Sequence, residues 1–254
     1  MKTYGAMRAV RLSQVRPEGW LKTMLEKERE GFPGHLDEIG YPFNLPCWTL
    51  KSMADGGFEQ WWPYEQTGYW MDAMTRTALL LRDDDMLSRF KAIIDTSIER
   101  AQDGFIGPNE LHKADPRSQW PHAVYFRAIY AMWSMTGDEK YLSALERHYM
   151  LPDNRYDQDR GAVNIETMLR TALAAGNEAL RQKALDNYAR LQADVADTAD
   201  FGYRKMLSDA PTGIHGVSLN EIGKLPAIIY AFTGDEEQLR AAEHLYAKIL
   251  RDHM

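Results

Sequence analysis

A short segment that would end one helix and begin another recurs along this chain, and it constrains the fold more than any other feature. Each copy has a small or polar breaker, then Asp or Asn, an acidic residue and Leu. The copies are RDDDML at 82–87, TGDEKYL at 136–142, AGNEAL at 175–180 and TGDEEQL at 233–239. Gly137 and Gly234 favour the left-handed conformation that closes a helix. Asp138 and Asp235 suit the cap of the following helix, so each copy predicts a helical hairpin.

The rest of the chain shows helical spacing and almost no strand signal. Before the second copy, apolar side chains recur on one helical face, at Phe126, Ile129, Tyr130 and Trp133. No long run alternates in the manner of a strand rich in β-branched residues. The stretches 103–121 and 151–163 are rich in Gly, Pro, Asp and Asn, and they predict loops. The segment GWLKTMLEKEREGF, near the N-terminus, predicts one further helix.

These signals predict an all-α protein built of antiparallel helical hairpins that pack side by side. Such hairpins either stack as an open solenoid or close into an α/α toroid. A complete ring of six hairpins usually needs a longer chain than 254 residues. We therefore predict a single, incomplete domain over residues 1–254, which forms part of an (α/α)6-type toroid.

Charge and hydropathy exclude several classes of partner. The net charge is −7, and Lys and Arg form no cluster, which argues against nucleic acid and acidic membrane surfaces. No apolar run approaches the roughly 18 residues of a membrane-spanning helix. The first residues also lack the apolar core of a secretory signal. As the sequence stands we expect a cytoplasmic protein, or an exported one if a leader has been removed.

The chain has a single cysteine, Cys47, in the apolar segment LPCWTL. One cysteine cannot form an intrachain disulfide or a zinc site with several thiolate ligands. We expect a packed, inert thiol, and we expect neither a metal site nor another cofactor in this chain. The sequence also contains no nucleophile elbow, phosphate-binding loop or HExxH segment.

Polar and aromatic residues gather where the inner helices of the toroid should begin. The stretches that carry them are WWPYEQTGYW, SQWPHAVYF, GAVNIETML and GIHGVSLNE. If these helix starts meet at one rim, they form a polar cleft with aromatic walls. Sugars suit such a cleft, because their hydroxyl groups need fixed hydrogen-bond partners and their C–H faces stack on aromatic rings.

Glu65 is the leading candidate for an acid, since five of the ten residues at 61–70 are aromatic. Rings that exclude water from a carboxyl group create the environment of a catalytic proton donor. In the alternative interpretation the rings are core and Glu65 caps the helix. Glu221 is the second candidate catalytic carboxylate. The candidate substrate-binding residues are Trp61, Tyr64, Tyr69, Trp120, His122, His215 and Asn220.

Several stretches, in this order, resemble the N-terminal part of glycoside hydrolase family 127, which is typified by β-L-arabinofuranosidases. They are VRPEGWLKTMLE, GFPGHLDE, GYWMDA, DGFIGP, WPHAVYFRAIYAMWSMTGDEKYL and HGVSLNEIGKLPAIIYAFTGDEEQL. The resemblance implies an (α/α)6 barrel with a carbohydrate pocket at its rim. It places His122 and His215 at pocket histidines of the family. Tyr69 falls where the family usually has a histidine.

The resemblance also implies that the catalytic half of the family's barrel lies outside this chain. In the family, an acid/base glutamate and a nucleophilic cysteine follow the HGV…TGDEEQL segment. That cysteine belongs to a zinc site of one glutamate and three cysteines, which Cys47 alone cannot replace. An incomplete ring would expose apolar helix flanks. We therefore expect self-association, or a partner chain that completes the ring.

These observations predict a glycoside hydrolase-like protein that acts on, or binds, an arabinofuranoside-type or related glycan. In this chain alone, Glu65 and Glu221 would have to supply the acid and the base. The alternative is a non-catalytic carbohydrate-binding or helical scaffold protein, which would use the same rim without turnover. A protein-binding solenoid is less well supported, because the repeats share their links but not their surface residues.

Overall fold

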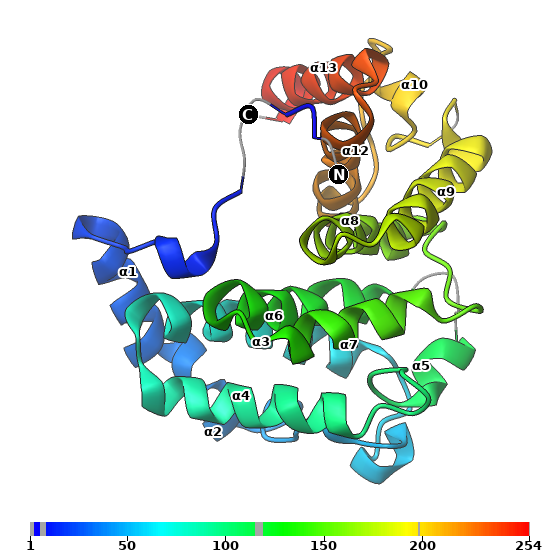
Figure 1. Ribbon diagram of the computed structural model, residues 1–254. Helices are drawn as coiled ribbons and strands as arrows, with labels where there is room; N and C mark the ends of the chain where they lie inside the picture. The colour runs from blue at the N-terminus through cyan, green and yellow to red at the C-terminus, as the bar shows by residue number, and fades with distance from the viewer. Residues whose placement is uncertain (1–2, 6–8, 115–118, 198, 254) are drawn as a thin grey trace. The chain divides into compact units, whose positions relative to one another are not determined.

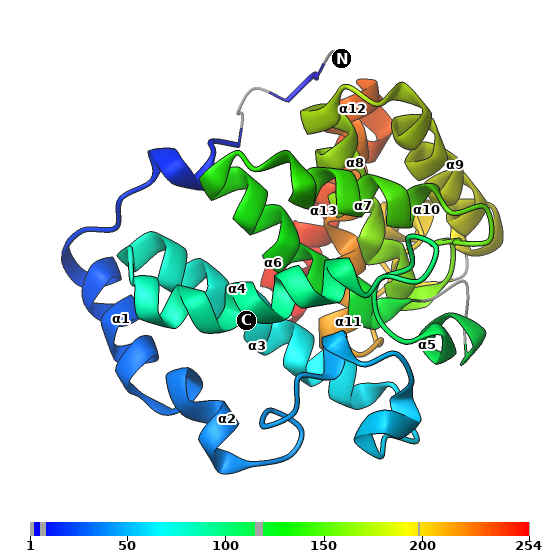
Figure 2. The same ribbon diagram turned by 60° about the horizontal axis from the view of Figure 1, so that its bottom comes forward.

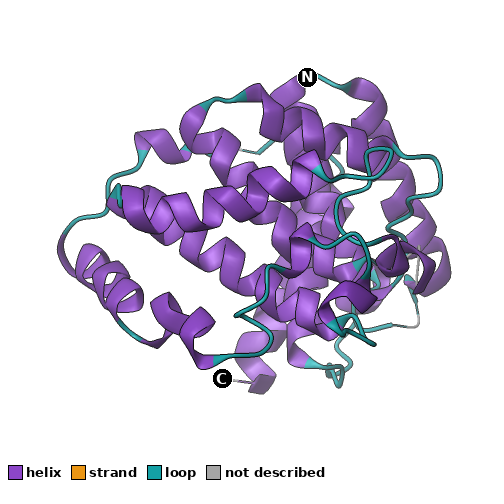
Figure 3. Cartoon of the chain, turned by 90° about the horizontal axis from the view of Figure 1, so that it is seen from below, coloured by secondary structure: helices purple, strands orange, loops and turns teal. Residues whose placement is uncertain are grey.

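The computed structural model describes residues 3–5, 9–114, 119–197 and 199–253 (Figure 1). Throughout these ranges the protein is helical and contains no strand, which confirms the all-α prediction (Figure 3). None of the described helices combines the length and the apolar character needed to cross a membrane. The chain divides into two compact units: the first unit is Ala9–Asn154, and the second unit joins Arg155–Met254 to Met1–Arg8.

The first unit contains two long helical hairpins preceded by short helices. Its elements are η1 (Leu12–Gln14), α1 (Gly19–Glu30), η2 (Phe32–His35), α2 (Leu36–Ile39), η3 (Cys47–Thr49), η4 (Met53–Gly56), α3 (Trp62–Leu81), α4 (Asp84–Glu99), α5 (Asn109–Ala114), α6 (Trp120–Thr136) and α7 (Glu139–Met150). The second unit contains η5 (Asp159–Val163), α8 (Asn164–Ala175), α9 (Glu178–Val195), α10 (Tyr203–Met206), α11 (Gly216–Gly223), α12 (Leu225–Thr233) and α13 (Glu236–His253).

All four copies of the recurring segment form the helix–turn–helix links that were predicted. A residue with positive φ closes each leading helix: Arg82 (60°), Gly137 (72°), Gly176 (69°) and Gly234 (77°). An Asp or Asn side chain then accepts a backbone N–H of the next helix. The pairs are Asp83 with Met86 (2.9 Å), Asp138 with Lys140 (3.1 Å), Asn177 with Leu180 (2.9 Å) and Asp235 with Glu237 (2.9 Å).

Two inner helices, α3 and α6, run parallel at the centre of the first unit, with α4 packed on α3 and α7 on α6 (Figure 1, Figure 2). At the starts of the two helices, the Trp120 side chain donates a hydrogen bond to Glu65. Gly68 lies about one turn further along α3, and a Cβ atom there would be 2.7 Å from a methyl carbon of Val124. The absence of a side chain at Gly68 therefore permits the close approach of the two helices.

The second unit has the same plan, with α9 packed on α8 and α13 on α12. Glu166, in the first turn of α8, pairs with Lys224, immediately before α12, at 2.7 Å. At the other end, Arg181 of α9 donates to the Phe232 carbonyl at 2.8 Å. Thus α8 and α12 also run parallel. Open solenoids and α/α toroids both have parallel inner helices, so closure into a toroid stays a prediction.

The structure corrects the two stretches that were expected to be loops. Within 103–121 the chain forms α5 and begins α6, and within 151–163 it forms η5. Pro121 lies in the first turn of α6, where proline's missing N–H has no helical partner to lose. Pro226 has the same position in α12, and α11 stops just before it.

An aromatic core fills the first unit. Trp48 stacks on Tyr125 with ring centroids 4.1 Å apart and meets Tyr64 edge-on at 5.5 Å. Cys47 lies beside this core with its side chain buried, and burial raises the pKa of its thiol to about 11. The thiol is therefore protonated at neutral pH, which fits the expected inert, packed residue.

Candidate functional site

Glu65, Tyr69 and Trp120 meet where α3 and α6 begin. The Trp120 indole Nε1 donates a hydrogen bond to Glu65 Oε1 at 2.5 Å, and both side chains are buried. The Tyr69 ring lies one turn along α3, with its centroid 6.2 Å from that of Trp120 in an edge-on arrangement. Pro63 and Pro121 lie in the first turns of the two helices, where proline favours the start of a helix. The structure therefore joins three of the predicted site residues into one cluster.

The cluster continues as a polar stripe along α3, made of Glu65, Tyr69, Asp72 and Arg76. Arg76 pairs with Asp72 at 2.5 Å through its Nε atom and donates to the Arg127 carbonyl of α6 at 3.2 Å. Asp72 and Arg76 were missed in the sequence. They follow Glu65 by seven and eleven residues, and positions with this spacing share one helical face. That spacing was the signal in the sequence that could have identified them.

Tyr64 and Trp61 lie outside this cluster. The Tyr64 side chain is fully buried between Trp48 and Phe58, and burial raises the pKa of its hydroxyl. Trp61 is 43% exposed and borders a separate hollow of about 410 Å³ with Phe58 and Glu110. The ring-rich stretch around Glu65 therefore divides between core and surface.

His122 holds a turn from inside the core. It lies two residues after Trp120 on α6 and so points to the opposite side of the helix from the Glu65 cluster. Its Nε2 donates to the Ile106 carbonyl at 2.8 Å, and its ring contacts Trp48 and Phe105. Complete burial lowers the pKa of His122 to about 4, so the ring is neutral at pH 7. Its contact with a sugar stays a prediction, made for a residue that has no exposed surface here.

His148 of α7 completes this arrangement, and the sequence offered no sign of it. Its Nδ1 accepts the Ile106 backbone N–H at 3.0 Å, so the two histidines bind both polar groups of one residue. The other ring nitrogen of His148 donates to the side chain of Gln119 at 3.0 Å. Gln119 in turn donates to Asn154 at 2.8 Å. This buried network connects the segment DGFIGP to α6 and α7.

The remaining predicted residues lie at α11 in the second unit. His215 caps this helix, accepting the Ser218 N–H at 3.4 Å, and its side chain is exposed. Asn220 is exposed and donates to the Gly216 carbonyl at 2.9 Å. Glu221 is half-buried and accepts Lys224 Nζ at 2.8 Å. Because Lys224 also pairs with Glu166, one ammonium group joins two carboxylates at this helix entrance.

Among the described residues, no three His, Cys, Asp or Glu side chains come together in a way that could hold a metal ion. In comparisons with known proteins, no family model, no curated protein and no solved structure matched this chain. The candidate site is therefore defined by its geometry: the Glu65–Tyr69–Trp120 cluster and the polar stripe that extends from it along α3.

Proposed function

We propose that this chain is a glycoside hydrolase-like protein that acts on or binds a glycan, of arabinofuranoside or related type, in a pocket at the rim of a partial toroid. The observation that carries the proposal is the bond between Glu65 and Trp120, with Tyr69 one turn further along. It brings a carboxyl group, an indole and a phenol together at the starts of two parallel helices. These groups are the ones that recognise sugar hydroxyls and sugar C–H faces.

In a hydrolytic reaction Glu65 would be the proton donor to the leaving oxygen. The aromatic side chains around it exclude water from the carboxyl group, as a glycosidase acid requires. Retaining and inverting hydrolases both need a second carboxylate, as nucleophile or as base.

The test is hydrolysis of a panel of aryl glycosides that includes β-L-arabinofuranosides. We expect turnover by the intact chain, and we expect Glu65→Gln to reduce it by about 10²–10⁴-fold, the usual contribution of a general acid. Glu243→Gln is the matched control, because Glu243 is an exposed residue of α13 that shares none of these contacts. A rate equal to that of buffer, unchanged by Glu65→Gln, would remove the catalytic form of the proposal.

The second candidate is a non-catalytic carbohydrate-binding protein. It is favoured by the bond that Glu65 accepts from Trp120, because a carboxylate used to join two helices has a structural reason to be there. Calorimetric titration with the same sugars separates the two functions. Binding heat without turnover supports the second candidate, whereas the absence of both heat and turnover contradicts both.

A further inference from the structure

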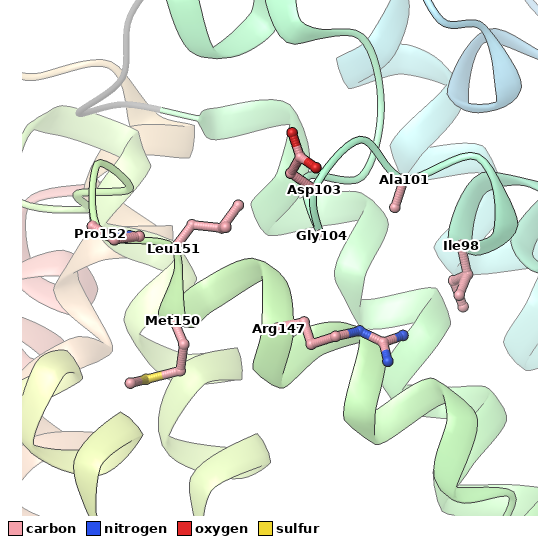
Figure 4. Close-up of a pocket in the computed structure, with 8 residues that line it drawn as sticks. All are labelled: Ile98, Ala101, Asp103, Gly104, Arg147, Met150, Leu151 and Pro152. Carbon is pink, nitrogen blue, oxygen red and sulfur yellow. The ribbon is translucent and has the colours of Figure 1, made fainter.

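A second hollow in the first unit lies away from the Glu65–Tyr69–Trp120 cluster. It has a volume of about 480 Å³ and lies between the end of α4, the turn that follows it and the end of α7 (Figure 4). Its lining residues are Ile98, Ala101, Asp103, Gly104, Arg147, Met150, Leu151 and Pro152. Small-molecule sites usually have volumes of roughly 300–1,000 Å³ and apolar walls with a few polar groups, and this hollow fits that description.

Two opposite charges border the otherwise apolar hollow. Asp103 and Arg147 are both exposed, and neither side chain makes an ion pair or a hydrogen bond with any part of the chain that the structure describes. Figure 4 shows the two side chains pointing in different directions, so the charges lie at separate edges. Met150 and Leu151 add apolar surface to the lining on one side of the hollow (Figure 4), and Met150 is 39% exposed.

The turn that carries Asp103 is firmly held. Gln102 and Phe105 exchange two backbone hydrogen bonds of 2.9 and 2.8 Å, and the residues between them, Asp103 and Gly104, have φ of 51° and 94°. Positive φ at both positions is typical of the tight two-residue turn favoured by Asp-Gly. The next residue, Ile106, is bound by the two buried histidines. The Asp103 carboxylate therefore starts from a fixed backbone, which lowers the entropy cost of binding a ligand.

We propose that this hollow binds a small zwitterion with an apolar body, of the class of hydrophobic amino acids and their short peptides. Arg147 would bind the ligand's carboxylate through its forked N–H groups. Asp103 would bind the ammonium group, and Met150 and Leu151 would contact the apolar side chains. A simple anion would be repelled by the negative charge of Asp103, and a simple cation would be repelled by the positive charge of Arg147. An uncharged apolar ligand would remove water from both charges and offer neither a partner.

The test is calorimetric titration of the intact chain with leucyl-leucine, its N-acetyl form and its C-terminal amide. We expect the free dipeptide to bind roughly tenfold more tightly than either blocked form, because each lost charge removes one charge-assisted hydrogen bond. Arg147→Gln should weaken the free and acetylated forms by about the same factor and leave the amide unaffected. Asp103→Asn should weaken the free dipeptide and the amide and leave the acetylated form unaffected. Asparagine is suitable there because it tolerates positive φ.

Controls distinguish loss of the site from loss of the fold. Arg240→Gln is the matched variant, because Arg240 is an exposed arginine of α13 in the other unit. It should bind all three ligands like the parent chain, and far-UV circular dichroism should be the same for every variant. No binding of leucyl-leucine, equal binding of free and blocked forms, or binding that survives both substitutions would overturn the proposal. None of these outcomes depends on Glu65 or on glycan turnover.

Discussion

At the scale of single residues, His122 and His148 bind the two backbone polar groups of Ile106, one histidine as a hydrogen-bond donor and the other as an acceptor. His122 donates to the carbonyl, and His148 accepts from the N–H. A neutral imidazole can do either, because one ring nitrogen carries a proton and the other carries a lone pair. Burying the backbone of a turn requires such partners, since an unpaired N–H or carbonyl group in a core is costly. The two rings therefore allow the turn to pack inside the first unit.

This role predicts a dependence of stability on pH. Because burial lowers the pKa of folded His122 to about 4, the unfolded chain, with a histidine pKa near 6.5, binds the proton more tightly. The stabilisation is complete above about pH 6.5 and is lost as the pH falls towards 4, by about 3 kcal/mol. Urea unfolding followed by tryptophan fluorescence between pH 7 and pH 4 would measure it.

The control is His122→Gln, which keeps a donor for the Ile106 carbonyl but has no charge to gain. Carboxylates that titrate near pH 4 affect both proteins equally, so only the difference between them reports on His122. We expect this variant to be less stable at pH 7 and to depend less on pH. Identical pH slopes for the two proteins would show that His122 does not cause the effect.

At the scale of secondary-structure elements, the four links impose the hairpin plan. In each of them a residue with positive φ ends the leading helix, and an Asp or Asn side chain begins the next. Three of the four positive-φ residues are glycines, and the fourth, Arg82, shows that the turn tolerates a side chain. The residue that ends one helix and the residue that caps the next are neighbours in the sequence. Each hairpin turn is therefore specified by a few consecutive residues.

Asp138 offers a direct test of this local specification. Its side chain accepts the Lys140 N–H at 3.1 Å. Asp138→Ala removes that acceptor and should lower the free energy of unfolding by about 1 kcal/mol. Asp138→Ser keeps an acceptor oxygen in place and should lower the free energy of unfolding by only a few tenths of that amount. Urea unfolding of the two variants would measure the difference, and an equal loss of stability in both would mean that the cap contributes nothing.

At the scale of the whole molecule, the chain order interleaves the two units. Tyr4 donates its backbone N–H to the Ala231 carbonyl of α12 at 2.7 Å, so the N-terminal segment belongs with the second unit. The first unit is thus inserted between two parts of the second. All the tryptophans lie in the first unit, at positions 20, 48, 61, 62, 70, 120 and 133. Their fluorescence therefore reports on that unit, whereas circular dichroism reports on both.

Lys248 provides a way to perturb the second unit alone. This buried lysine donates to the carbonyls of Lys205, Ser208 and Ala210 at 3.0–3.2 Å. Lys248→Met leaves those carbonyls without their ammonium donor and should destabilise the second unit by about 2–3 kcal/mol. Because each unit has its own core, we expect the midpoint measured by circular dichroism to fall while the fluorescence midpoint stays unchanged.

The exposed Lys27 of α1 serves as the control, and Lys27→Met should change neither midpoint appreciably. Equal shifts of both midpoints in Lys248→Met would show instead that the chain unfolds as one cooperative body. A Lys248→Met variant as stable as the parent would show that the three carbonyl bonds contribute little to stability.

The sequence by itself determined the long paired helices and the links between them, because caps and helical periodicity depend on neighbours within a few residues. It did not predict the short helices α5 and η5, which lie in stretches expected to be loops. The tertiary structure alone decided which side chains meet. Glu65 and Trp120 were separate candidates 55 residues apart, and His148 gave no signal although it binds Ile106 across 42 residues. Such pairs depend on how helices pack, and a close approach such as that at Gly68 is set by the surfaces of both helices together. The hollow at Asp103 and Arg147 likewise exists only because segments distant in sequence pack together.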